Sequence, residues 1–268
     1  MMVETTIDED FKRTLLDNMT WSFSRLSSFD QCPYCWKRNY LDCEEKESNA
    51  YAEYGTLCHS LLERYEKGEL DMFSLPDQYE KEYYDIVQHE FPPNKYIDLN
   101  EKYKNNGYDY FSTINWTPDD IEVLGVEEEV RFEIDSHPFV GYIDLRFRDK
   151  DGNIILADHK SANIKQTKKG GFYSADKDKI MMYKRQQYLY SRYFVEQGIK
   201  VNFLEWNFFD SGWVYKIPWN KEEYDEAERW AVDTIKQIYD CTNFCPNPNM
   251  YFCNFICDYR HSCDYRPA

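Results

Sequence analysis

The spacing of apolar residues changes along the chain from a helical to an extended period. Within residues 54–66, Leu57, Leu61 and Tyr65 recur every four residues, which predicts an amphipathic helix. From 121 to 133 apolar and polar positions alternate, which predicts a strand with one buried face. The chain therefore contains both helical and extended elements.

Two short apolar runs follow that first strand, at residues 139–148 and 153–160. The Asp-Lys-Asp-Gly sequence between them is typical of a tight turn, so we expect these strands to pair. A second hairpin is predicted where Asp210-Ser-Gly separates two strand-like segments. Helical periodicity predicts further helices near 24–31 (capped by Ser24), 77–90, 179–197 and 221–240.

These elements predict an α/β fold with a mixed central β-sheet flanked by helices, in one domain over residues 1–268. Residues 66–120 are aromatic and charged, and we interpret them as a helical insertion. Residues 161–176 are polar and contain glycine, which predicts a loop. The cysteine-rich segment 241–268 has little regular periodicity.

Two acids interrupt the apolar strands. Asp144 lies in Val-Gly-Tyr-Ile-Asp-Leu, and Asp158 ends the run Ile-Ile-Leu-Ala. Acids are depleted in strands and costly to bury unpaired, so two of them on neighbouring strands favour a bound cation such as Mg²⁺ or Mn²⁺. Lys160 faces the same side as Asp158, where it can orient water or stabilise developing charge.

A structural interpretation of these acids is also open. Asp144 can pair with an arginine, and Asp158 can cap a turn. For either acid alone the two interpretations are about equally favoured. The combination of both acids with Lys160 favours the metal site, because the structural interpretation needs several independent coincidences.

The net charge of the chain is −17, which excludes a basic footprint for nucleic acid over the whole molecule. A local one is present between the second acid and the helix at 179–197. Its basic residues are Lys160, Lys165, Lys168, Lys169, Lys177, Lys179, Lys184 and Arg185. This segment can guide a phosphate backbone, although most lysine-rich loops are simply solvated. We expect weak, salt-sensitive binding to DNA or a protein partner that supplies affinity.

Cysteines cluster near the C-terminus, where Cys253, Cys257 and Cys263 lie within eleven residues, and Cys32 lies far upstream. The N-terminus lacks an apolar signal region, which favours a cytoplasmic chain, and metal ligation explains clustered cysteines there better than disulfides. Cys35 is an alternative ligand because Cys32-x-x-Cys35 has metal-like spacing. No run of 18 apolar residues is present, so a membrane span is not expected.

Four ordered motifs resemble the PD-(D/E)XK nuclease superfamily, and within it the RecB-like group that includes CRISPR-associated exonucleases. They are Gly55-x-x-x-His59-x-x-Leu62-Glu63, Gly141-x-x-Asp144, Asp158-His159-Lys160 and Gln186-x-x-x-Tyr190. The resemblance spans residues 24–263. It implies a restriction-endonuclease-like core. Each motif alone is weak evidence for the superfamily, whereas the four motifs in this order are fairly specific.

The resemblance also implies a role for each motif. His59, Asp144 and Asp158 are expected to bind the metal, together with the backbone carbonyl of His159. Lys160 is expected to be the catalytic lysine. Gln186 and Tyr190 are expected to contact the substrate strand or position Lys160, with Gln187 as an alternative donor. Glu63 is expected either to support His59 or to be a surface acid.

A further resemblance concerns the cysteines. The segment Ser22-x-Ser-x-Leu-x-x-Phe-x-x-Cys32-Pro33 is similar to the N-terminal ligand motif of RecB-like iron–sulfur nucleases. It implies a 4Fe–4S cluster on Cys32, Cys253, Cys257 and Cys263, which closes segment 241–268 onto 20–45. The chain has C-x3-C-x5-C where the family has C-x2-C-x5-C, and four thiolates can also bind Zn²⁺.

The resemblance and the residues together predict a Mg²⁺- or Mn²⁺-dependent deoxyribonuclease. We expect an exonuclease that acts on single-stranded DNA or DNA ends in recombination, repair, or CRISPR or phage DNA processing. DNA contacts are expected from Lys165, Lys168, Lys169, Lys184 and Arg185. Two alternatives remain: a DNA-end-binding or accessory subunit that does not cut, and a zinc-stapled interaction protein. The chain lacks G-x-x-x-x-G-K-[ST], so unwinding requires a partner.

Overall fold

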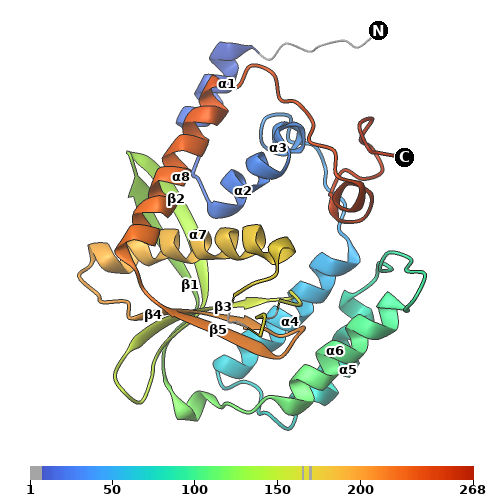
Figure 1. The fold of residues 1–268 in the computed structure, drawn as a ribbon, viewed down its shortest axis with the longest axis vertical. Helices are drawn as coiled ribbons and strands as arrows, with labels where there is room; N and C mark the ends of the chain where they lie inside the picture. Colours follow the sequence, from blue (N-terminus) through green and yellow to red (C-terminus); the bar gives the residue numbers. More distant parts are fainter. Residues whose placement is uncertain (1–7, 165, 169–170) are drawn as a thin grey trace. The chain divides into compact units, whose positions relative to one another are not determined.

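The computed structural model describes residues 8–164, 166–168 and 171–268 (Figure 1). The chain divides into two compact units. The first unit comprises Met1–Glu47, Arg131–Gly141 and Glu222–Ala268, and the second comprises Ser48–Val130 and Tyr142–Lys221. The second unit therefore contains the two strand acids and the lysine, and the first contains the paired cysteine segments.

Five strands form one mixed sheet in the order β1-β2-β3-β4-β5. They are β1 (Glu122–Ile134), β2 (His137–Arg148), β3 (Ile154–Lys160), β4 (Phe203–Phe208) and β5 (Trp213–Pro218). The pairs β2–β3 and β4–β5 are antiparallel, whereas β3–β4 is parallel. A parallel pair needs a long crossover, and α7 (Ser174–Glu196) provides it. The predicted α/β fold with a mixed sheet is confirmed.

Strand β3 is covered by helices on both faces. Successive side chains of a strand point to opposite faces. Accordingly Lys160 contacts Gln186 of α7, whereas His159 contacts Glu66 of α4 (Ala50–Glu66). In Figure 1, α7 runs along one side of the strands and α4 lies on the other. The residues that precede these contacts in β3 are buried, so the chemistry-bearing residues lie at the end of a fixed core strand.

Residues 66–120 contain two α-helices, α5 (Leu75–Ile86) and α6 (Leu99–Thr113), joined by an irregular segment, and the short 3₁₀ helix η1 (Pro118–Asp120). The sequence predicts a helix near 77–90 but does not single out α6, because Asn-Asn-Gly107 inside it is typical of a turn. Gly107 instead lets α6 approach α5, since a Cβ there would collide with the ring of Tyr79. That this segment is an insertion remains a prediction.

The first unit contains α1 (Glu9–Asp17), α2 (Phe23–Gln31), α3 (Pro33–Tyr40), most of α8 (Lys221–Asp240) and the π-helical turn η2 (Phe252–Ile256). Ser22 caps α2, not Ser24 as predicted, because its hydroxyl accepts the N–H of Arg25 at 3.3 Å. Cys32 then separates α2 from α3, whose first residue is Pro33. Cys32 is buried at this junction, where its N–H donates to the Ser28 carbonyl and its own carbonyl accepts from the Trp36 N–H.

Aromatic rings join the C-terminal segment to the N-terminal helices of this unit. Trp36 stacks on Phe244 with ring centroids 5.8 Å apart, and Phe29 meets both rings edge-on. The N–H of Asn247 also lies 3.4 Å from the Cys32 sulfur. These contacts hold the sulfur-rich ends of the chain together. Every helix in the described ranges is too short or too polar to serve as a membrane span.

Candidate metal centre and active site

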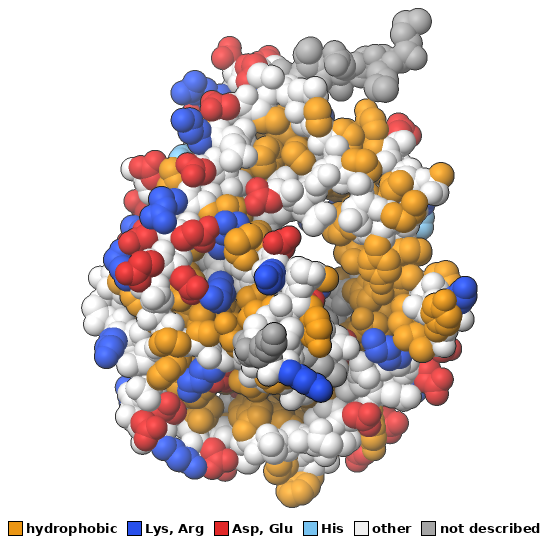
Figure 2. All heavy atoms as spheres, in the orientation of Figure 1, with side chains coloured by type: hydrophobic (Ala, Val, Ile, Leu, Met, Phe, Trp, Pro, Cys, Tyr) orange, Lys and Arg blue, Asp and Glu red, His pale blue; other side chains and the backbone are white. Residues whose placement is uncertain are grey.

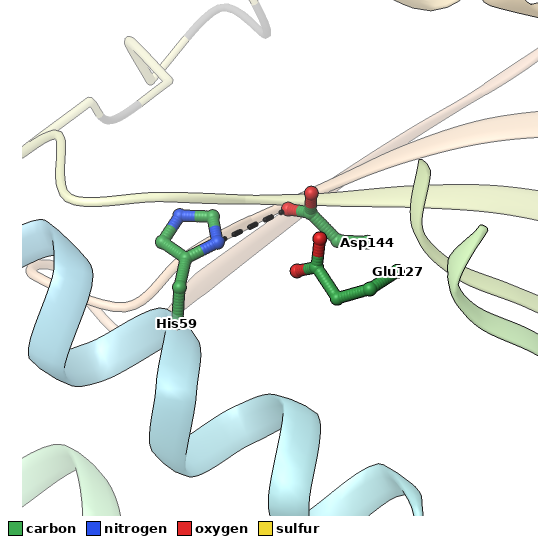
Figure 3. Close-up of side chains that lie close together, drawn as sticks. All are labelled: His59, Glu127 and Asp144. Carbon is green, nitrogen blue, oxygen red and sulfur yellow. Dashed lines mark ion pairs between the residues drawn. The ribbon is translucent and has the colours of Figure 1, made fainter. Parts of the chain in front are cut away.

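Three potential metal ligands converge in the second unit. His59, Glu127 and Asp144 each offer a ligand atom, and these atoms all lie within 4.8 Å of one another. Figure 3 shows the three side chains pointing toward one another from α4, β1 and β2. His59 Nδ1 lies 3.5 Å from Asp144 Oδ2. The predicted pairing of His59 with Asp144 is thus present in the geometry, and Glu127 joins it.

The position of Asp144 follows from the way two strands separate. The regular register between β2 and β3 ends at Leu145 and Ala157. Just beyond that pair, the N–H of His159 donates to Asp144 Oδ2 at 2.6 Å. At this point, where the two strands separate, the Asp144 carboxylate accepts the N–H that a backbone carbonyl of the neighbouring strand would otherwise accept. This fixes the carboxylate beside His59.

Glu127 was not a candidate in the sequence analysis. Its φ of 49° is in the left-handed region, inside a strand. This distortion interrupts the alternation of β1, so that consecutive acids go to different partners: Glu128 pairs with Arg146, and Glu129 accepts from the Tyr142 hydroxyl. Such strained backbone positions cluster at functional sites. The Glu-Glu-Glu run at 127–129 is the only sequence signal that points here.

The donor set fits a divalent cation. One imidazole nitrogen and two carboxylates suit Mn²⁺ or Mg²⁺, and neutral imidazole is the binding form. Octahedral ligands at about 2.1 Å from an ion lie roughly 3–4 Å from one another, so the observed spacing needs only small adjustments. His59 is suited to this role because burial lowers its pKa to about 4, although Asp144 opposes that shift.

Burial also perturbs Glu127. Burial, together with the negative charges of Asp144 and Glu63, raises the pKa of Glu127 to about 7. Carboxylates held this close repel one another without a cation between them. Glu63 itself pairs with Lys67 one turn along α4. The Glu63 carboxylate adds negative charge near the site. Among the described residues it is not one of the three clustered candidate ligands.

Asp158 and Lys160 form a buried pair beside this group. The Lys160 ammonium lies 2.9 Å from Oδ1 and 2.8 Å from Oδ2 of Asp158. Burial raises the pKa of Asp158 to about 6, with Asp144 adding to the shift and Lys160 opposing it. Burial alone would lower the pKa of Lys160, but the two carboxylates outweigh it and raise that pKa. The lysine is therefore a fixed cation.

Asp158 was predicted to be a metal ligand, but its carboxylate contacts Lys160. The third residue that clusters with His59 and Asp144 is Glu127. Asp158 Oδ2 nevertheless has no hydrogen-bond partner among the described residues, because the ammonium near it is poorly aligned. That oxygen remains available to another ligand. Metal binding by Asp158 and by the His159 carbonyl stays a prediction.

The helix that follows the loop supplies a second partner for Lys160. Gln186 Oε1 accepts from the Lys160 ammonium at 3.1 Å. Tyr190, one turn further along α7, is bonded to Gln186, and burial raises its pKa to about 12. Gln187 points elsewhere and donates to the backbone carbonyl of Glu205 at 2.8 Å. The geometry therefore favours Gln186 over Gln187 as the group that positions the lysine.

The side chain of His159 lies on the opposite face of β3. Its Nε2 lies 2.7 Å from Glu66 Oε1, and its Nδ1 lies 3.0 Å from the carboxamide nitrogen of Asn207. Burial would lower the pKa of His159, but the Glu66 carboxylate outweighs it and raises the pKa to about 9. This buried ion pair anchors the residue whose N–H holds Asp144.

Of the residues predicted to contact DNA, Lys165 and Lys169 lie outside the described residues. Lys168 is exposed in the loop before α7, and Lys184 and Arg185 lie on α7. On the face shown in Figure 2, basic and acidic side chains are intermixed. The predicted DNA contacts therefore stay predictions.

Five cysteines line one small apolar pocket in the first unit: Cys32, Cys35, Cys253, Cys257 and Cys263. The pocket thus contains the four predicted ligands and the alternative, Cys35. The Cys35 thiol lies between two of the others. Its hydrogen bonds lower the pKa of Cys32 to about 5 and that of Cys257 to about 7.

The fold and the acid–lysine constellation define a class of α/β proteins with a candidate metal centre at the fork of a mixed sheet. A model of the PD-(D/E)XK nuclease superfamily matches residues 20–264, and the chain belongs to that superfamily. The superfamily uses divalent metal ions, in agreement with the donor set. Among curated proteins, no sequence matches the chain significantly.

The solved structures that are similar to this chain include two that are described by name. One is described as a "Putative exonuclease" from Eubacterium rectale; it is 12% identical, covers 100% of this chain and 95% of its own, and has a TM-score of 0.54. At that identity the likeness shows the fold. The other, SSO0001, is 16% identical, covers 97% of both chains and has a TM-score of 0.39.

Proposed function

We propose that this nuclease is a Mg²⁺- or Mn²⁺-dependent deoxyribonuclease that degrades single-stranded DNA or DNA ends as an exonuclease. The observation that carries the proposal is the convergence of His59, Glu127 and Asp144 within 4.8 Å, in a member of the PD-(D/E)XK superfamily. The fold shared with the Eubacterium rectale protein supports exonucleolytic action. Recombination, repair, and CRISPR or phage DNA processing all require this chemistry.

The residues around the centre have distinct roles in this proposal. His59, Glu127 and Asp144 hold the ion, with Asp158 and the His159 carbonyl as further ligands. A divalent ion in this position supplies Lewis-acid activation of water and neutralises phosphate charge. Lys160 remains protonated and stabilises the negative charge that develops on the phosphate oxygens. Gln186, which Tyr190 supports, holds the ammonium in position.

The test is a cleavage assay on end-labelled single- and double-stranded DNA in Mn²⁺ and in EDTA. We expect nucleotides to be released progressively from the ends of the labelled strand in Mn²⁺, and no cleavage in EDTA. Internal fragments without terminal products would show endonucleolytic action. DNA binding in EDTA without cleavage in Mn²⁺ or Mg²⁺ would support the accessory-subunit alternative instead.

The Glu127 carboxylate provides a direct test of the ligand group. Glu127→Gln keeps the size of the side chain and removes its charge, so we expect the affinity for Mn²⁺ to fall at least about tenfold. Calorimetric titration with Mn²⁺ measures this without DNA. Glu129→Gln is the matched control, because Glu129 lies two residues along β1 and contacts Tyr142. Equal Mn²⁺ affinity in both variants would remove Glu127 from the site.

An aromatic surface supports single strands as the substrate. On the face of Asp158 and Lys160, the register continues to Trp213 and Tyr215 on the edge strand β5. Both rings are partly exposed, and Phe172 from the loop before α7 contacts them at centroid distances of 6.0 and 5.0 Å. Unpaired bases stack on such rings, whereas paired bases are already stacked.

Trp213→Ala is expected to weaken the binding of single-stranded oligonucleotides by about 1–3 kcal/mol, the usual value of one stacked base. Fluorescence anisotropy in Ca²⁺ or EDTA measures binding separately from cleavage. Val214→Ala serves as the control, since Val214 is exposed on the opposite face of β5. Unchanged affinity in the tryptophan variant would contradict a stacking role for this edge of the sheet.

We further propose that Cys32, Cys253, Cys257 and Cys263 hold a 4Fe–4S cluster. A single zinc ion with bonds of 2.3 Å requires sulfur atoms about 3.8 Å apart in a tetrahedron. Among the described residues no three cysteine sulfurs lie mutually within 4.8 Å, which favours a larger group. Iron, sulfide and zinc analysis of anaerobically purified protein, with its visible absorbance, distinguishes the cluster from zinc.

A further inference from the structure

The pocket in the first unit contains one cysteine more than a four-thiolate group needs. Of its five cysteines, Cys35 is the one outside the ligand set proposed for the cluster. It lies in the first turn of α3, three residues after Cys32. Its side chain is partly buried, so it contacts the pocket and is not simply a solvent-facing thiol.

Cys35 lies close to a thiol from the other end of the chain. Its sulfur is 3.5 Å from that of Cys257, although 222 residues separate the two. Cys257 is buried and directly follows the π-helical turn, where its N–H donates to the Phe252 carbonyl at 2.8 Å. Helix α3 and this turn therefore hold the two sulfur atoms facing each other.

The separation is short enough for a covalent bond after a small movement. A disulfide has a sulfur–sulfur distance of about 2.05 Å, so the two atoms must approach by about 1.5 Å. Rotation about the Cα–Cβ bond of one cysteine moves its sulfur by more than that. By contrast, Cys43 and Cys245 are the exposed cysteines, and an oxidant in solution reaches them more easily.

We propose that Cys35 and Cys257 form a disulfide when the pocket holds no metal group and the chain meets a peroxide. One thiol attacks a peroxide oxygen and the O–O bond breaks. That oxygen stays on the sulfur as a sulfenic acid, and the other oxygen leaves in an alcohol or in water. The second thiol then attacks the sulfenic sulfur and releases the transferred oxygen as water. Two thiols thus lose two protons and two electrons in total, and one peroxide molecule takes up both electrons. The bond joins α3 to the C-terminal segment.

The disulfide and metal ligation by Cys257 exclude each other, because both use the same sulfur. This consequence rests on the ligand set proposed above, whereas the disulfide itself does not. Oxidation of the metal-free chain then blocks reloading of the pocket until a thiol reductant restores Cys257. Cys35 accordingly acts as a resolving thiol, and metal binding does not require it.

The first experiment treats the metal-free full-length chain with hydrogen peroxide and maps disulfides by mass spectrometry of non-reduced peptides. We expect the Cys35–Cys257 cross-link to form first, to disappear in Cys35→Ser and in Cys257→Ser, and to persist in the control Cys43→Ser. A parent chain in which Cys35 and Cys257 remain unlinked, or in which Cys257 is cross-linked to Cys32, would overturn the proposal.

The second experiment measures bound iron and zinc in the same variants after anaerobic purification. We expect Cys35→Ser to retain the metal content of the parent and Cys257→Ser to lose it. Equal loss in both variants would make Cys35 a metal ligand and reject its role as a resolving thiol. Neither readout depends on DNA cleavage, so a chain that fails to cut DNA leaves this inference intact.

Discussion

Lys160→Met is expected to lower the rate of DNA cleavage by about 10²–10³-fold, the usual effect of removing one preorganised charge-stabilising group. The ammonium of Lys160 is fixed by Asp158 and Gln186, so it is in place before substrate arrives. Methionine keeps a long, unbranched side chain and removes its charge. Single-turnover cleavage of an end-labelled strand in Mn²⁺ measures the loss.

The control for that variant is Lys200→Met, which removes an exposed lysine from the connection between α7 and β4. It reproduces the change of net charge, and we expect cleavage at the parental rate. Calorimetric Mn²⁺ binding should persist in Lys160→Met, because the ligand group does not include the lysine. If Lys160→Met cuts DNA as fast as Lys200→Met, the lysine has no part in the chemistry.

Glu66→Gln is expected to lower the free energy of unfolding by about 3–5 kcal/mol, because it removes one partner of a buried ion pair, and the imidazole must then either lose its proton or remain charged without a counter-charge. The side chains of Glu66 and His159 are only 1% and 4% exposed, and their charged atoms lie 2.7 Å apart. Urea denaturation monitored by tryptophan fluorescence measures the change in stability. A loss of cleavage activity should accompany it, since His159 also holds Asp144.

A partly exposed ion pair in the same unit gives the matched control. Arg64 and Glu82 lie 2.8 Å apart with side chains 27% and 22% exposed. Glu82→Gln is expected to change stability by less than about 1 kcal/mol, since water screens the remaining charge. Similar losses in the two variants would show that the His159–Glu66 pair is not a buried ion pair.

The parts of the site that could be predicted from sequence are those that follow a regular period. Asp158 and Lys160 share one face of β3 because they are two residues apart, and Gln186 and Tyr190 are one helical turn apart on α7. Glu127 could not be found in this way. The position of its side chain depends on a left-handed backbone conformation inside β1. The alternation of apolar and polar residues along a strand does not reveal where such a distortion occurs.

The elements of the fold that could be predicted are likewise those with a regular pattern of apolar residues. Strands with alternating or continuous apolar residues were predicted close to their observed positions, because burial of one or both faces fixes the pattern. Helix α6 was missed because its glycine serves a contact with Tyr79 of another helix. Local composition there indicates a turn, and only the tertiary contact explains the helix. The proximity of Cys35 and Cys257 likewise depends on how distant segments meet.

The long crossover between β3 and β4 determines when, during synthesis, the chain can first form a complete site. The proposed metal ligands and Lys160 come from α4, β1, β2 and β3. Gln186, which holds the lysine, comes from α7 and is therefore synthesised later. Pairing across such a long connection is slow, because its loop-closure entropy is lost before its contacts form. A nascent or truncated chain that ends before β4 therefore lacks a completed sheet around Lys160. We expect such fragments to be inert toward DNA.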